Sequence, residues 1–275
     1  MFEGAQFMTI KLIAIDIDGT LLNEKNHLAP ATIEAVGAAR QKGIKVVLCT
    51  GRPLSGVKPY LDALKITGAD EYAITFNGAM SQSLDGQVIT HQTLTHDEFL
   101  ETEMLARKLG VHYQFETMDA IYAFNRDLSP YSVGESYLVR LPIKYRTPEE
   151  IKPDLVISKA MFVDFPKLIT KANTNLPQSL RDKMYVVQSE PFFIEIMNQK
   201  ASKGNALQAL SKDLGLTAEN IMAIGDQGND LTMIEYAGTG VAMGNAIDEV
   251  KAAATVITKP NSEDGVAYAI NKWAL

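Results

Sequence analysis

The sequence predicts an α/β fold with a parallel sheet, into which a second domain is inserted. Short apolar runs alternate with helix-like segments at the start of the chain, and the same alternation resumes after Lys203. Between these parts, candidate strands show the period-two alternation that is typical of antiparallel sheets. With 275 residues, 46% of them hydrophobic, the chain is long enough to bury a substantial core.

The first part of the chain contains three apolar runs, each too short for a helix. Near-continuous apolar strands favour a parallel sheet that is covered on both faces. Pro30 stands where a helix can start, and Gly43 stands where it can stop. Strands are therefore predicted at residues 10–15, 45–49 and 72–76, and helices from Pro30 to Gly43 and from Pro53 to Leu64.

The middle of the chain begins with a hairpin-like segment at residues 84–93, which contains Asp85-Gly86. Thr95 and Glu98 then form a capping-box pattern, which predicts a helix that closes at Gly110. Further strands are predicted at residues 112–116, 121–124, 156–165, 184–188 and 192–197.

The last part of the chain returns to the α/β pattern. Helices are predicted at residues 205–214, 231–237, 247–254 and 265–275, and strands at 221–224, 240–243 and 256–257. We therefore expect residues 1–90 and 198–275 to form one α/β core, with residues 91–197 as an inserted domain.

The overall charge argues against strongly anionic partners. The formal charge is −7, so a nucleic acid or an anionic membrane would meet net repulsion. The single cysteine, Cys49, cannot form an internal disulfide, and the four histidines lack the spacing of a zinc site. No apolar run reaches the roughly 18 residues that span a bilayer, and residues 1–9 lack a signal-peptide pattern. We expect a cytoplasmic protein; its oligomeric state stays open.

Two pairs of acids follow predicted strands. Asp16 and Asp18 end the first strand, and Asp226 and Asp230 follow the strand at residues 221–224. Either pair alone could belong to a turn or a helix cap. Together, at strand ends where open parallel sheets bind ligands, they favour a cation site. Oxygen ligands without His or Cys indicate Mg²⁺.

Two further segments could bind a phosphate. Thr50-Gly51-Arg52 ends a strand and supplies a hydroxyl and backbone N–H groups near a helix start. Lys203 stands at the head of a predicted helix, where a lysine taken alone would be an ordinary surface residue. In this order along the chain, Lys203 is interpreted as a phosphate clamp.

In this order, the four segments resemble the haloacid dehalogenase superfamily of phosphatases. The matching residues are Asp16-Ile17-Asp18-Gly19-Thr20, Thr50, Lys203 and Gly225-Asp226 with Asn229-Asp230. Further segments are similar to the Cof-type branch and its YidA-like sugar phosphatases: Thr50-Gly51-Arg52-Pro53, Asn77-Gly78-Ala79, Ser202-Lys203-Gly204 and Met243-Gly244-Asn245-Ala246. The resemblance implies a Rossmann-like core with an inserted α+β cap of the C2 type.

The resemblance also implies a role for each matching residue. Asp16 would attack phosphorus, and Asp18 would act first as acid and then as base. The implied metal site consists of Asp16, Asp18 through its backbone carbonyl, Asp226 and Asp230, with Gln227 as a further contributor. The implied phosphate contacts are Ile17, Thr50, Gly51, Lys203 and Asn229. Arg52, Asn77, Gly78 and Asn245 are expected on the substrate side.

Other functions remain as alternatives. A phosphomutase would use the same aspartyl-phosphate but would pass the phosphoryl group to a sugar, and a non-catalytic metal-dependent binding protein is a further alternative. A cysteine phosphatase is disfavoured because Ser55 stands where the Cys-x5-Arg pattern after Cys49 needs an arginine. In the inserted domain, four candidates could select the substrate or simply be polar loop residues: Tyr131, Glu135, Tyr137 and Arg140.

Overall fold

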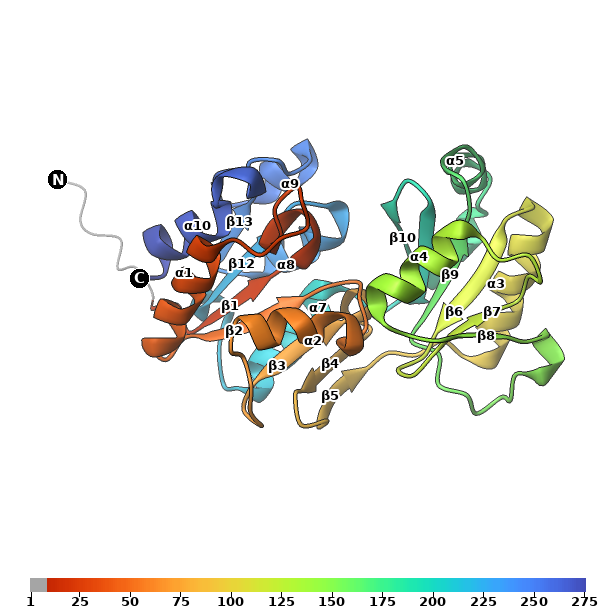
Figure 1. Ribbon diagram of the computed structural model, residues 1–275, viewed down its shortest axis with the longest axis horizontal. Coiled ribbons are helices and arrows are strands. Elements are labelled where there is room, and N and C mark those ends of the chain that lie inside the picture. The colour runs from red at the N-terminus through yellow and green to blue at the C-terminus, as the bar shows by residue number, and fades with distance from the viewer. Residues whose placement is uncertain (1–8) are drawn as a thin grey trace.

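The computed structural model describes residues 9–275 and contains two sheets with helices packed around each (Figure 1). Residues 1–8 lie outside the described residues. Two expectations fall on them: the start of the core segment 1–90, and the lack of a signal peptide, which concerned residues 1–9. No helix within residues 9–275 is both long enough and apolar enough to cross a membrane.

The first sheet has eight strands and confirms the predicted α/β fold. Its spatial order is β14-β13-β12-β1-β2-β3-β4-β5, and the strands from β14 to β3 are parallel. β4 and β5 are antiparallel and form a hairpin that begins at Met80, before the predicted segment 84–93, and that extends this sheet. The strands are β1 (Leu12–Ile15), β2 (Lys45–Cys49), β3 (Tyr72–Thr75), β4 (Met80–Ser83), β5 (Val88–His91), β12 (Ile221–Gly225), β13 (Thr239–Ala242) and β14 (Val256–Ile257).

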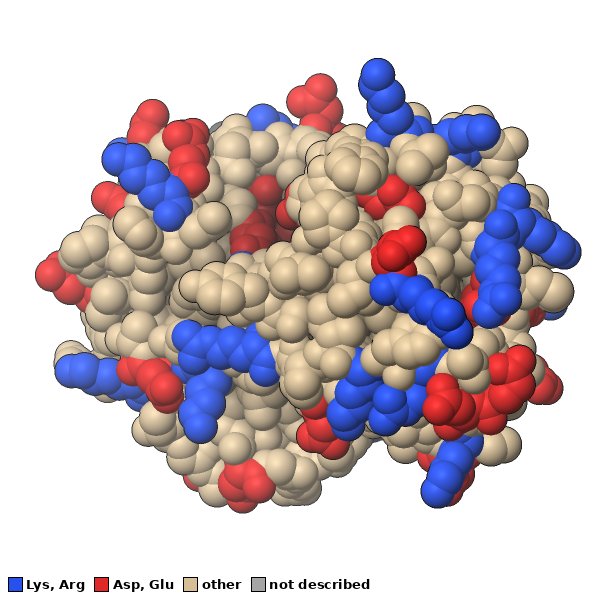
Figure 2. Space-filling view, turned by 45° about the vertical axis from the view of Figure 1, so that its right-hand side comes forward, with Lys and Arg blue, Asp and Glu red and all other residues tan. Residues whose placement is uncertain are grey.

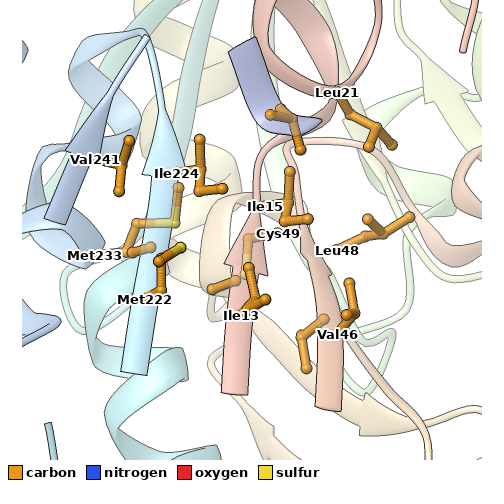
Figure 3. Packing of buried hydrophobic residues seen from close by; sticks show 14 of the residues in the cluster. Ile13, Ile15, Leu21, Val46, Leu48, Cys49, Met222, Ile224, Met233 and Val241 are labelled. Carbon is orange, nitrogen blue, oxygen red and sulfur yellow. The ribbon is translucent and has the colours of Figure 1, made fainter. Parts of the chain in front are cut away.

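Six helices accompany this sheet. α1 packs against α10 and β2, whereas α7 packs against α8 and against the strands β3, β4 and β5. Buried side chains of β1, β2 and β12 fill the space around the central strands, as Ile13, Leu48 and Ile224 illustrate in Figure 3. The helices are α1 (Pro30–Gln41), α2 (Leu54–Ala63), α7 (Lys203–Asp213), α8 (Leu231–Tyr236), α9 (Asp248–Ala253) and α10 (Gly265–Trp273).

The second sheet has six strands in the order β10-β11-β9-β6-β7-β8. It is antiparallel except for the pair β7 and β8, which is parallel. A separate hydrophobic cluster, which includes Phe99, Phe115 and Phe162, lies on it. The strands are β6 (His112–Glu116), β7 (Ile121–Ala123), β8 (Ile143–Tyr145), β9 (Lys159–Val163), β10 (Met184–Glu190) and β11 (Phe193–Asn198).

The helices of the second sheet were only partly predicted. The capping box of Thr95 and Glu98 is present, and Gly110 ends the first helix in the left-handed conformation. The helix at Pro130 was missed because its Ser, Gly and β-branched residues are poor helix formers, although Ser129 caps it. The helices are α3 (His96–Leu109), α4 (Pro130–Val139), α5 (Pro166–Thr174) and α6 (Gln178–Lys183).

The chain passes between the two sheets twice, once after β5 and once after β11. The two passages are hydrogen-bonded to each other, since Asn198 Nδ2 donates to the carbonyl oxygen of Thr93 at 3.0 Å. Away from these passages, α4 contacts α2, and β10 contacts the short turn Gly228–Asp230 (Figure 1). The carboxyl ends of the parallel strands therefore lie close to the second sheet.

Candidate active site

The predicted motif residues meet at the carboxyl ends of three adjacent parallel strands. Asp16 follows β1, Thr50 follows β2 and Asp226 follows β12. Gly19 permits the close approach, because a Cβ atom there would lie 2.4 Å from Oδ2 of Asp226 and the residue has φ +80°. Strand order thus brings together residues that are more than 200 positions apart.

Three carboxylates form a buried cluster at this edge. Each of Asp16, Asp226 and Asp230 offers an oxygen atom, and the three atoms lie within 4.8 Å of one another. Thr20, whose contact was not predicted, donates from Oγ1 to Oδ1 of Asp226 at 2.7 Å. Oδ2 of Asp230 accepts from the backbone N–H groups of Asp226 and Gln227, which fixes its position.

Lys203 is completely buried between two members of this cluster. Its Nζ lies 2.5 Å from Oδ1 of Asp16 and 2.6 Å from Oδ1 of Asp230. Burial alone would lower the pKa of Lys203, but the two carboxylates raise it above its usual value. The side chain is therefore a fixed positive charge beside Asp16, and not an ordinary surface lysine.

The cluster still has more negative than positive charge. Burial, and then the neighbouring Asp230, raise the pKa of Asp16 well above its usual value, against the opposing effect of Lys203. The same two causes raise the pKa of Asp226 to about 6. Oxygen-only donors in excess over one lysine match the donor set of a hard divalent cation, so the residues present fit such an ion.

Asp18 has a different environment from Asp16, although both carboxylates line the same cavity. Arg52 holds the Asp18 carboxylate with two N–H groups; Nε donates to Oδ2 at 2.8 Å and Nη2 donates to Oδ1. Nη1 of Arg52 donates to the hydroxyl of Tyr60 at 3.2 Å. Arg52 therefore orients the second acid of the first motif.

The remaining predicted residues lie around these acids. Asn229 Nδ2 donates to Oδ1 of Asn77 at 2.9 Å, and both side chains line the cavity together with Thr50 and Gly51. Asn245 Nδ2 donates to the carbonyl oxygen of Gly19 at 2.9 Å, which ties another loop to the first motif. Ile17 is buried directly after Asp16.

Gly78 does not line this cavity, among the residues that the structure describes. Its φ is +88°, and a Cβ atom would lie 2.1 Å from the carbonyl oxygen of Ser202. Gly78 thus lets the chain after β3 pack directly on the residue that caps the Lys203 helix.

Cys49 is fully buried in β2, where burial raises the pKa of its thiol. A thiol that stays protonated is a poor nucleophile, which agrees with its interpretation as a small strand residue.

The second sheet closes the cavity, which has a volume of about 270 Å³. Of the four candidates in this region, Tyr131 and Glu135 line it, whereas Tyr137 is 88% exposed. Among the further lining residues that sequence reasoning missed are Lys159, Glu190, Phe192 and Glu195. They come from three strands and a turn, and no local motif marks them.

Lys159 joins the two sheets inside the cavity. Its Nζ donates to Oε1 of Glu195 at 3.1 Å and to the backbone carbonyl oxygen of Gly51 at 3.2 Å, and it lies 3.4 Å from Glu116. Asn77 Nδ2 also donates to Glu195, so a buried polar network connects strand ends of the first sheet to β9 and β11. Figure 2 shows acidic side chains recessed in a hollow on one face of the molecule.

The chain is similar to known hydrolases along most of its length. A family model described as haloacid dehalogenase-like hydrolase matches residues 13–270. A Streptococcus pyogenes protein with the name "Putative phosphatase" is 45% identical over 269 residues, which cover 98% of this chain and all of that protein.

Solved structures agree over nearly the whole chain. A haloacid dehalogenase-like hydrolase from Bacteroides thetaiotaomicron has a TM-score of 0.85 and 32% identity, covering 96% of this chain and 99% of that one. A structure titled as a HAD subclass IIB sugar phosphatase has a TM-score of 0.80 and 26% identity, covering 95% and 98% of the two chains.

Proposed function

Because the chain belongs to the haloacid dehalogenase-like hydrolase family, of the Cof type, and is a phosphatase, we propose that it hydrolyses a small sugar phosphate through an aspartyl-phosphate on Asp16. The observation that carries this proposal is the position of Asp16. Its carboxylate lines the cavity, Lys203 holds Oδ1, and Oδ2 takes part in no hydrogen bond within residues 9–275. That oxygen is therefore available for attack.

We assign the catalytic core to residues 1–90 and 198–275 and the cap to residues 91–197. The two sheets, each with a large hydrophobic cluster of its own, support this division. The core supplies the reacting groups, and the cap covers the cavity and excludes water from it.

In the proposed reaction, an Asp16 oxygen attacks phosphorus while the bond between phosphorus and the leaving oxygen breaks. Asp18, in its protonated form and with one oxygen released from Arg52, gives its proton to that leaving oxygen. In the second half, Asp18 takes a proton from water, the water oxygen attacks phosphorus, and the Asp16 carboxylate is released together with inorganic phosphate. Arg52, which is bound to Asp18 on both oxygens, orients this acid and base.

The phosphoryl oxygens would be held by side chains and backbone groups of the core. Thr50, Lys203 and Asn229 offer donors, together with the backbone N–H groups of Ile17 and Gly51. These groups favour the charge that is spread over the transferring phosphoryl group. Their position on strand ends and helix starts keeps them rigid.

Mg²⁺ is the proposed cofactor, and Asp16, Asp226 and the backbone carbonyl of Asp18 would hold it. When bound, the ion supplies positive charge to the phosphoryl oxygens. Asp230 orients Asp226 through the backbone, and Gln227 Nε2 donates to Oδ2 of Asp226 at 3.3 Å.

The proposal is tested with a panel of phosphorylated metabolites, assayed with magnesium and with a chelator. Asp16→Asn removes the nucleophilic charge at nearly constant shape, so turnover is expected to fall at least about 1,000-fold. Asp62→Asn, on an exposed residue of α2, is the matched control and should keep full activity. An active Asp16→Asn variant would contradict the mechanism.

A further inference from the structure

The cap side of the cavity contains more carboxylates than cations. Glu135, Glu190 and Glu195 line this side, whereas Lys159 is the one cap cation among the described lining residues. Lys159 is already paired with Glu195 and Glu116. Arg52, on the core side, is paired with Asp18. No lining cation is therefore left over for Glu135 and Glu190.

The unmatched carboxylates face the same space. Glu190 stands at the exposed rim of the cavity, where partial burial, and then the charges of Asp18, Glu195 and Glu135, raise its pKa against the opposing effect of Arg52. Burial also raises the pKa of Glu135, which is 7% exposed, against the opposing effects of Lys159 and Arg52, neither of which forms an ion pair with it. Glu135 comes from α4 and Glu190 from the end of β10. Both carboxylates line the part of the cavity that would hold the leaving group.

The same side of the cavity has an aromatic wall. Tyr131 and Phe192 are stacked, with ring centroids 4.4 Å apart and an angle of 12° between the rings. Phe193 packs edge-on against Phe192. A flat apolar surface beside carboxylates suits a molecule with C–H groups on one face and hydrogen-bond donors at its rim.

The cavity is also small. Its volume of about 270 Å³ lies below the usual range for drug-sized ligands, which starts near ~300 Å³. In the proposed reaction the phosphoryl group would occupy the end beside Asp16, behind which Lys203 is completely buried. At Asp18, Glu190 and Gln227 this cavity adjoins a second, more open cavity of about 660 Å³, so the leaving group can extend past Glu190 and the smaller cavity alone does not set its size.

From these features we propose that the cap selects phosphate esters whose leaving group carries hydroxyl or amino donors and no second anionic group, with Glu135 and Glu190 as the specificity-determining residues. This inference rests on the proposed function. Carboxylates accept hydrogen bonds from hydroxyl and amino groups, whereas a second anion would lie near like charges without a cation to balance it.

The carboxylates on the cap side also argue against a phosphomutase. A phosphomutase has to hold a sugar bisphosphate, whose second phosphate would lie at the cap side. The carboxylates of that side disfavour such a ligand, and they therefore favour transfer of the phosphoryl group to water.

The test uses three six-carbon 6-phosphates of similar size and different charge: the hexose phosphates glucose 6-phosphate and glucosamine 6-phosphate, and the open-chain acid 6-phosphogluconate. Each is assayed as a substrate with magnesium, and as a competitive inhibitor of 4-nitrophenyl phosphate hydrolysis. We expect kcat/KM, or the reciprocal of the inhibition constant, to be at least tenfold lower for 6-phosphogluconate than for glucose 6-phosphate. Comparison of glucose with glucosamine 6-phosphate separates hydroxyl from amino recognition.

Glu135→Gln and Glu190→Gln remove the charges at constant shape. Each is expected to reduce the discrimination against 6-phosphogluconate at least threefold, whereas Glu34→Gln, on an exposed residue of α1, should leave the ratio unchanged. Because the test compares the kcat/KM values of two substrates for the same variant, a general loss of active enzyme does not change the ratio. Equal use of the anionic and neutral compounds, or unchanged ratios in both variants, would overturn the proposal. Failure to hydrolyse any phosphate ester would overturn the proposed function as well.

Discussion

At the scale of single residues, Lys203 has the most constrained position in the site. An ammonium group without any exposed surface is stable only where carboxylates compensate for its lost hydration. Asp16 and Asp230 provide that compensation at 2.5 and 2.6 Å. The same lysine therefore contributes to folding and, under the proposed function, to the charge that a bound phosphoryl group would meet.

Lys203→Met is expected to affect both activity and stability. Activity should fall at least about 100-fold, as it does when one electrostatic donor of a transition state is removed. The free energy of unfolding at neutral pH should fall by about 3–5 kcal/mol, because two buried carboxylates lose their cation. Steady-state kinetics and urea unfolding measure the two effects. Lys200→Met, on an exposed neighbour, is the control; a fully active and stable Lys203→Met variant would refute this account.

At the scale of elements, the site depends on close contact between the turn after β3 and the start of α7. Gly78 makes that contact possible, since a side chain there would collide with the backbone of Ser202. Ser202 in turn caps α7, and Lys203 is the first residue of this helix. A backbone contact thus sets the distance between Lys203 and the strand ends.

Gly78→Ala is expected to lower the free energy of unfolding by about 2–5 kcal/mol, because it combines an unfavourable φ with a steric clash. Gly37→Ala in α1 is the matched control. A Cβ atom at position 37 meets no atom within 4 Å, so the substitution should stabilise the helix by about 0.5–1 kcal/mol. Denaturant unfolding compares the two, and equal stability of both variants would show that the predicted clash is relieved.

The sequence predicted those elements whose pattern is local. The apolar runs before Asp16, Thr50 and Asp226 predicted three strands. Because parallel strands bring their carboxyl ends together, the polar residues after these runs also predicted the site. Glu195, Lys159 and Glu190 could not be found in this way. They lie on separate strands of the cap, and only the tertiary fold directs them into the cavity. α4 was missed because packing compensates for its weak helix propensity.

At the scale of the whole molecule, a buried polar network connects the second sheet to the strand ends of the first sheet, which are the proposed cap and core. Lys159 of the cap contacts the backbone of Gly51 in the core, and Glu116 lies on the far side of this lysine, without a hydrogen-bond partner for either of its oxygens among residues 9–275. Glu135 and Glu195 add further negative charge around Glu116. The free energy of unfolding should therefore depend on the protonation of this network.

Burial, with Glu135 and Glu195 nearby and Lys159 opposing them, raises the pKa of Glu116 to about 8 from 4.5. Between these values the folded protein binds more protons than the unfolded chain, so this group lowers the free energy of unfolding as pH rises. Glu116→Gln removes the effect. The free energy of unfolding of the variant, relative to wild type, should therefore be greater at pH 8 than at pH 5, on the order of 1–3 kcal/mol.

Chemical unfolding at the two pH values measures this difference. Glu249→Gln, on an exposed residue of α9, should show none. A relative stability of Glu116→Gln that stays constant from pH 5 to pH 8 would mean that Glu116 is ionised throughout this range.

The hydrogen bond between Asn198 and Thr93 has a consequence for how such a protein can diversify. The two passages of the chain lie side by side, so the inserted segment enters and leaves the core at one place. A segment of different length or fold can replace it there by recombination, without any change in the order of the core strands. The acids at the strand ends are then inherited unchanged, while the second sheet, with the residues that it contributes to the cavity, is exchanged as a unit.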